Sequence, residues 1–186
     1  TVAIAKSLGK LTSLSYLDLG GKNYIGYTAD DGTIALGQSL ANLTALTYLD
    51  LNNNWIGYTS DRGTTALGQG IVNLKLLQYF DLTYNNIGTT DDIGTVALGQ
   101  SVANLTDLTY LGLSLNKIGL TADDGTIALG QGVANLHFLS HLDLSKNSIG
   151  FTGRKGIKSL INALHALPSL QFFKFLPNTI SIEMVE

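Results

Sequence analysis

Hydrophobic and polar residues follow a pattern along this chain that returns about every 31 residues. In LTALTYLDLNNNWIG, residues 43–57, apolar and polar positions alternate from Tyr48 to Asn52, which predicts a short strand with Leu49 and Leu51 in the core. In GTIALGQSLAN, residues 32–42, the leucines recur at the spacing of one helix face, with Gln38 on the opposite side. Each unit is therefore expected to contain one strand and one helix.

Related stretches at equal spacing divide the chain into units. TADDGTIALGQ stands at residues 28–38 and again at 121–131, and DRGTTALGQ and DIGTVALGQ lie between them at regular steps. A fixed period of this length is typical of a repeat array. The first unit has one extra residue at Gly20-Gly21, which predicts a widened turn. We expect one repeat domain over residues 1–186, with a half-unit at 1–10, full units from residues 11, 43, 74, 105 and 136, and a terminal half-unit at 167–186.

Several positions of the unit have an expected structural role. An asparagine such as Asn54 follows each strand, where its amide can bond to turn backbone and form a column along the array. Gly37 and Ser39 are expected on opposite flanks of the helix, where small side chains let neighbouring helices approach. An aspartate precedes the helical stretch and is expected to cap it, in the column Asp30, Asp61, Asp92 and Asp123.

The recurring residues of the unit resemble the repeat of a known protein family. Asn54-Trp55-Ile56-Gly57, followed by Gly63, Leu67 and Ile71, resembles the helix-bearing leucine-rich repeats of the ribonuclease-inhibitor type. The resemblance implies an α/β fold, a right-handed horseshoe with parallel strands on the concave face and helices on the convex face. It also implies binding of another protein rather than catalysis. The period is longer than is usual in that family and the inhibitor's cysteines are absent, so ribonuclease inhibition is not implied.

Composition narrows the classes of partner. The formal net charge is -3 and the isoelectric point about 5.5, so a basic surface for a phosphate backbone is lacking and no nucleic-acid partner is expected. No apolar run approaches the length of a membrane span, so no membrane association is expected. Neither a metal-ligand set nor a cofactor fingerprint is present: Gln38 stands where a phosphate loop needs lysine. The absence of cysteine favours a cytosolic protein, or a bacterial one delivered into host cells, over a disulfide-stabilised extracellular protein.

The candidate binding surface is the outward face of the predicted strands. An aromatic column there runs beside an acidic one, and a tryptophan lies in a loop near their edge. Aromatic rings supply contact area, and a line of carboxylates attracts a cationic group. Copying of tyrosine and aspartate during repeat duplication, without selection for binding, explains the same columns equally well. The predicted partner-binding residues are Tyr16, Tyr48, Asp50, Trp55, Tyr79, Asp81, Tyr110, His141 and Asp143.

The preferred function is that of a monomeric module that binds a partner protein, one with a basic or extended segment. An alternative is an accessory repeat domain of a larger effector or signalling protein whose activity lies elsewhere. The chain does not begin with methionine, which favours a processed chain or a piece of something larger. A third hypothesis, an enzyme that uses His141 and Asp143, is much less favoured because no nucleophile and no enclosed pocket accompany them.

Overall fold

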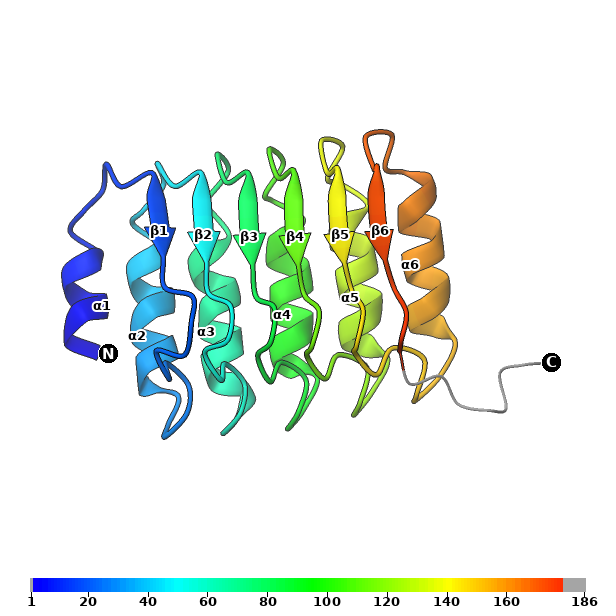
Figure 1. Ribbon diagram of the computed structural model, residues 1–186, viewed down its shortest axis with the longest axis horizontal. Coiled ribbons are helices and arrows are strands. Elements are labelled where there is room, and N and C mark those ends of the chain that lie inside the picture. Colours follow the sequence, from blue (N-terminus) through cyan, green and yellow to red (C-terminus); the bar gives the residue numbers. More distant parts are fainter. Residues whose placement is uncertain (1, 179–186) are drawn as a thin grey trace.

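A computed structural model of the chain describes residues 2–178. Residues 179–186 of the predicted terminal half-unit lie outside the described residues. Helices and strands alternate along the chain (Figure 1). The helices are α1 (Val2–Leu8), α2 (Asp31–Leu40), α3 (Asp61–Ile71), α4 (Ile93–Val102), α5 (Asp124–Val133) and α6 (Lys155–His165). The strands are β1 (Tyr16–Asp18), β2 (Tyr48–Asp50), β3 (Tyr79–Asp81), β4 (Tyr110–Gly112), β5 (His141–Asp143) and β6 (Phe172–Lys174).

The strands form one parallel sheet in the order β1-β2-β3-β4-β5-β6, and the helices form a second layer behind it (Figure 1). Equivalent residues of neighbouring units pair in register, as Tyr48 does with Tyr79. This arrangement confirms the predicted α/β repeat solenoid. Each assigned strand is shorter than the predicted Tyr48–Asn52, because the chain begins to turn after the third strand residue. Backbone pairing nevertheless continues, since the Leu51 N–H donates to the Asp81 carbonyl at 2.9 Å.

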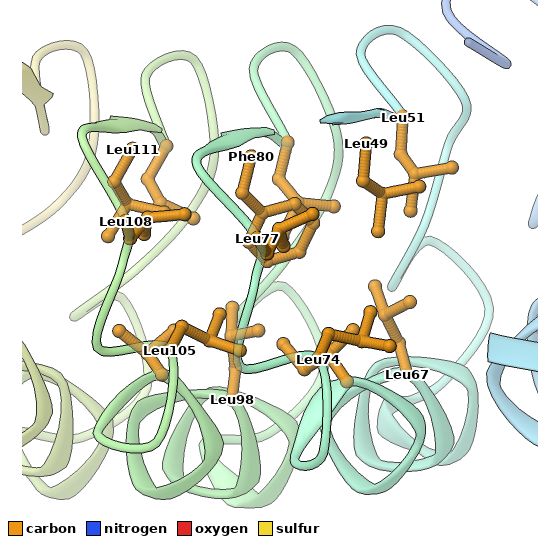
Figure 2. Close-up of a cluster of buried hydrophobic side chains, with 14 of the residues drawn as sticks. Leu49, Leu51, Leu67, Leu74, Leu77, Phe80, Leu98, Leu105, Leu108 and Leu111 are labelled. Atoms are coloured by element: carbon orange, nitrogen blue, oxygen red, sulfur yellow. The ribbon is translucent and has the colours of Figure 1, made fainter. Parts of the chain in front are cut away.

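The core lies between the two layers and repeats with the unit. Leu49 and Leu51 of the strand segment and Leu67 of α3 are all fully buried, as the alternation predicts. Figure 2 shows strand leucines and Phe80 pointing toward leucines from the helices and from the segments that follow them. Because each unit buries its apolar side chains partly against its neighbours, stability depends on stacking of the whole array.

The predicted asparagine column is confirmed, and it links successive units. Asn85 Oδ1 accepts hydrogen bonds from the backbone N–H groups of Asn54 and Ile56 at 3.0 Å each. Its Nδ2 donates to the Leu51 and Leu82 carbonyls, also at 3.0 Å. The amide therefore satisfies four backbone groups that have left the regular sheet.

The extra residue of the first unit interrupts this column at one place. Gly21 has a φ of 88°, and Gly26 lacks the positive φ of its equivalents Gly57 and Gly88, so the loop after β1 follows a different path. Asn54 Oδ1, which corresponds to the acceptor in Asn85, has no hydrogen-bond partner among the described residues. The widened turn predicted at Gly20-Gly21 thus displaces the donors that other units supply.

Small residues let the helices pack closely, as predicted. A Cβ built on Gly37 would lie 2.3 Å from the Ala66 carbonyl oxygen of α3, and one on Gly70 would lie 2.1 Å from the Gly37 carbonyl oxygen. On the opposite flank of α2, the Ser39 hydroxyl donates to the Ala5 carbonyl of α1 at 2.6 Å. Gly37 and Ser39 therefore face different neighbours.

The prediction that each aspartate of the column caps the helix of its own unit is wrong. Asp30, Asp92 and Asp123 make no side-chain cap bond to their own helices, and Asp61 lies inside α3, whose cap is Ser60. Three of the carboxylates accept from the first turn of the next helix instead: Asp61 Oδ2 from the Gly94 N–H at 2.9 Å, Asp92 Oδ2 from the Gly125 N–H at 2.5 Å and Asp123 Oδ2 from the Lys155 N–H at 3.1 Å. Asp30 accepts from the hydroxyls of Thr59 and Ser60, which directly precede α3. Each cap therefore joins two units.

Candidate protein-binding surface

Six aromatic rings stack in one continuous column across the strand face. Parallel in-register pairing places the first residue of each strand beside its equivalent in the next strand. Successive ring centroids are 4.2, 4.3, 4.3, 4.6 and 4.0 Å apart, and the ring planes lie within 21° of each other. We call this set the ring column; it consists of Tyr16, Tyr48, Tyr79, Tyr110, His141 and Phe172.

Stacking changes what the ring column presents to a partner. Tyr16 is 56% exposed and Phe172 43% exposed, whereas the four inner rings are only partly exposed. Each inner ring has both faces covered by its neighbours, so it presents its edge and its polar atoms outward. The sequence analysis treats these side chains simply as outward-facing, and it misses that they also support one another.

The aspartates at the third strand position form an acidic column beside the rings: Asp18, Asp50, Asp81 and Asp143. They have a structural role that the sequence analysis missed. The backbone N–H groups two residues further on donate to the Oδ1 atoms of Asp50 at 2.8 Å, Asp81 at 2.7 Å and Asp143 at 2.9 Å. This is the turn that aspartate side chains commonly make. Asp50 and Asp81 are each only 8% exposed. Asp50 and Asp81 are therefore less accessible than an outward acidic stripe implies, because their carboxylates hold the end of the strand.

Burial keeps three inner tyrosines of the ring column neutral to a higher pH than an exposed tyrosine. Burial raises the pKa of Tyr48 from 10.0 to about 12, and it raises the pKa of Tyr79 and of Tyr110 as well. Burial also raises the pKa of Asp50, against the opposing effect of the hydrogen bonds from Asn52. The Tyr79 hydroxyl donates to Asp81 Oδ2 at 3.3 Å, which links the two columns.

We expect the stability of the fold to fall as the pH rises from about 10 to about 12. The unfolded phenol ionises near its ordinary pKa, whereas burial holds the folded Tyr48 and Tyr79 neutral to higher pH. The stabilisation is therefore complete below pH 10 and is lost through the higher range. Melting temperatures of the parent chain and of Tyr79→Phe across this range test it, because phenylalanine keeps the stack and cannot ionise. Identical pH profiles for the two proteins would contradict the expectation.

A second aromatic cluster lies in the loops after β1 and β2. Tyr27 contacts Trp55 with ring centroids 5.0 Å apart and Tyr58 with centroids 5.9 Å apart, while Tyr24 contacts Tyr27 at 5.7 Å. Trp55 is partly exposed and lies in the left-handed region, with a φ of 64°. The structure thus places Trp55 in the strand-to-helix loops, apart from the ring column, and surrounds it with tyrosines.

His141 and Asp143 are not arranged as an acid–base pair. The His141 ring is stacked between Tyr110 and Phe172, at centroid distances of 4.6 and 4.0 Å. Asp143 Oδ1 accepts from the N–H and the hydroxyl of Ser145 at 2.9 and 2.6 Å. The hydrogen bonds found in residues 2–178 include none between the two side chains. Both residues therefore have contacts that belong to the repeat.

Within the described part of the chain, no group of three or more His, Asp or Glu side chains is placed to hold a metal ion. Over the same residues, no helix has both the length and the apolar character needed to cross a lipid bilayer.

The parallel sheet and the layer of helices place this protein in the class of α/β repeat solenoids. Within residues 2–178, the strand face, which carries the ring column, is not covered by helices. The chain is a leucine-rich repeat protein: the family model described as Leucine Rich repeat matches residues 42–60, 73–91 and 135–158. The first two matches begin one unit apart and the third two units later, in phase with the structural repeat. A search of curated proteins found no match. Domains of this family generally mediate protein–protein interaction, and their fold is typically a non-enzymatic scaffold.

Proposed function

We propose that this chain binds a partner protein through its strand face, with the ring column as the principal contact. The observation that carries this proposal is the continuity of the column, in which an aromatic ring from every strand stacks on the next. The rings need not be ordered upon binding, because their neighbours already hold them in place. Pre-organisation of this kind lowers the entropic cost of association.

The chemistry of the ring column favours an extended partner segment laid across the strands. Tyrosine edges offer apolar contact, and neutral hydroxyls offer hydrogen bonds in a row. Asp50 and Asp81 lie beside this row, bonded to backbone, so they favour a basic group on the partner mainly through their charge. The partner that fits best therefore combines apolar and hydrogen-bonding side chains with a few basic ones.

Binding should weaken when the middle of the ring column is removed. We expect Tyr79→Ala to cost about 1 kcal/mol or more of binding free energy, the usual threshold for an important interface residue. The partner is first captured from a lysate with the parent chain and identified, and its affinity is then measured by calorimetry. Asp81→Asn keeps the hydrogen-bonding turn while removing the charge, so it isolates the electrostatic contribution.

The control is Tyr58→Ala, which removes an exposed ring outside the ring column. Unfolding curves of both variants establish that each is folded at the temperature of the binding measurement. An identified partner that binds Tyr79→Ala as tightly as the parent chain would refute the proposed site.

A further inference from the structure

A second surface runs along the edge of the array where the strands end and the loops begin. One residue in each of five units adopts a left-handed conformation there, with φ between 55° and 65°. Each stands directly before the asparagine of the buried column. We call these residues the exit column; they are Lys22, Asn53, Tyr84, Leu115 and Lys146.

Except for Asn53, these residues are not the types that the backbone conformation favours. Glycine and asparagine adopt the left-handed region most easily, and bulkier side chains are strained there. Tyr84 is 54% exposed and Leu115 is also exposed, so core packing does not compensate for that strain. Residues held in such conformations without a packing role point to a function in recognition.

Two adjoining hollows follow the exit column from the second unit to the terminal half-unit. The first, of about 200 Å³, is lined by Trp55, Tyr84, Leu115, Lys117, Lys146 and asparagine amides. The second, of about 260 Å³, shares Lys117 and Lys146 with the first and extends toward Pro177. Neither lining contains a carboxylate, although the chain as a whole carries a net charge of -3.

The two lysines are available for an external anion. Lys117 and Lys146 are both exposed, and the ion pairs and hydrogen bonds found for residues 2–178 include none for either ammonium group. The first hollow is lined by both lysines together with Trp55, Tyr84 and Leu115, and the second by the same two lysines. Apolar contact and positive charge are therefore combined along one edge.

We propose that this edge binds an acidic segment of a protein, with carboxylates on Lys117 and Lys146 and an apolar side chain between Tyr84 and Leu115. We choose an acidic segment because of charge complementarity: Lys117 and Lys146 line both hollows, and neither hollow has a carboxylate from the described residues in its lining. The site is separate from the ring column, which presents neutral hydroxyls beside aspartates.

The chain carries a built-in reporter for this edge, since Trp55 is its single tryptophan and lines the first hollow. The probe is a blocked peptide of alternating glutamate and leucine, titrated into the parent chain while Trp55 fluorescence is recorded. We expect a saturable change that weakens as salt is added. A peptide of alternating lysine and leucine is expected to give none.

Substitutions separate a binding role from a structural one. We expect Lys117→Gln/Lys146→Gln to weaken binding of the acidic peptide at least tenfold. The charge-matched control Lys155→Gln/Lys158→Gln, on exposed residues of α6, should bind like the parent chain. Tyr84→Asn should melt at the same or a higher temperature, because asparagine suits the left-handed backbone, yet it should bind at least fivefold more weakly.

Three results would overturn the proposal. The first is the lack of a saturable fluorescence change with the acidic peptide, including a case in which only anionic lipid vesicles produce one. The second is equal binding by the parent chain and Lys117→Gln/Lys146→Gln. The third is unchanged binding by Tyr84→Asn. Since none of these measurements involves Tyr79, failure here is distinct from failure of the ring column as a binding site.

Discussion

Replacing Asn85 with alanine is expected to lower the free energy of unfolding by on the order of 3 kcal/mol, since each buried polar group left unpaired costs about 1–3 kcal/mol. The side chain satisfies the N–H groups of Asn54 and Ile56 and the carbonyls of Leu51 and Leu82. Alanine bonds to none of them, and the site is buried. Urea denaturation followed by circular dichroism gives the difference from the parent chain.

Asn23→Ala is the matched control for this experiment. Asn23 occupies the same position in the first unit but is exposed, and its side chain donates only to carbonyls of its own unit, those of Leu19 and Gly20. Water can replace those bonds, so the expected loss is below about 1 kcal/mol. Equal losses in the two variants would mean that the bonds between units do not carry the effect.

Valine at Gly37 is expected to lower the free energy of unfolding by about 1 to 3 kcal/mol through overpacking. A Cβ atom there would lie 2.3 Å from the Ala66 carbonyl oxygen and 2.6 Å from its carbon. These are backbone atoms of α3, so no side-chain rotation relieves the clash. The helices must move apart, which also disturbs the contact of Gly70 with α2.

The control for Gly37→Val is Gln38→Val in the same helix. Gln38 is exposed, so valine there costs only its lower helix propensity, within about 0.7 kcal/mol. Both variants carry the same new side chain one residue apart, and they differ in whether it meets α3. If Gly37→Val unfolds at the same urea concentration as Gln38→Val, close helix packing does not explain the glycine.

Periodicity in the sequence was enough to predict the elements and the core. Alternation around Leu49 and Leu51 and the helical spacing of leucines each allow one apolar face per element, and the structure buries those faces. The recurring asparagine after each strand was likewise predictable, because the turn backbone needs a bonding partner in every unit. The outward position of Tyr48 and Tyr79 followed from the same alternation, as did their placement in one column.

Contacts between units could not be assigned from the sequence. Asp61 was expected to cap its own helix, yet it accepts from the Gly94 N–H of the next one. Both helix starts carry the same residue types at the same spacing from an aspartate, so a repeated sequence does not distinguish them. Only the offset at which units stack selects the nearer N–H.

The same distinction between sequence and tertiary structure applies to the residues of the candidate sites. The sequence by itself determined which residues face outward on the strands, since alternation leaves two possible faces and the leucines occupy one. The tertiary structure alone decided that the tyrosine rings stack and that Trp55 and Lys146 line one hollow. The physical reason is distance along the chain. A side chain's direction follows from its neighbours in sequence, whereas its contacts depend on units about 31 residues away, whose positions are set by packing.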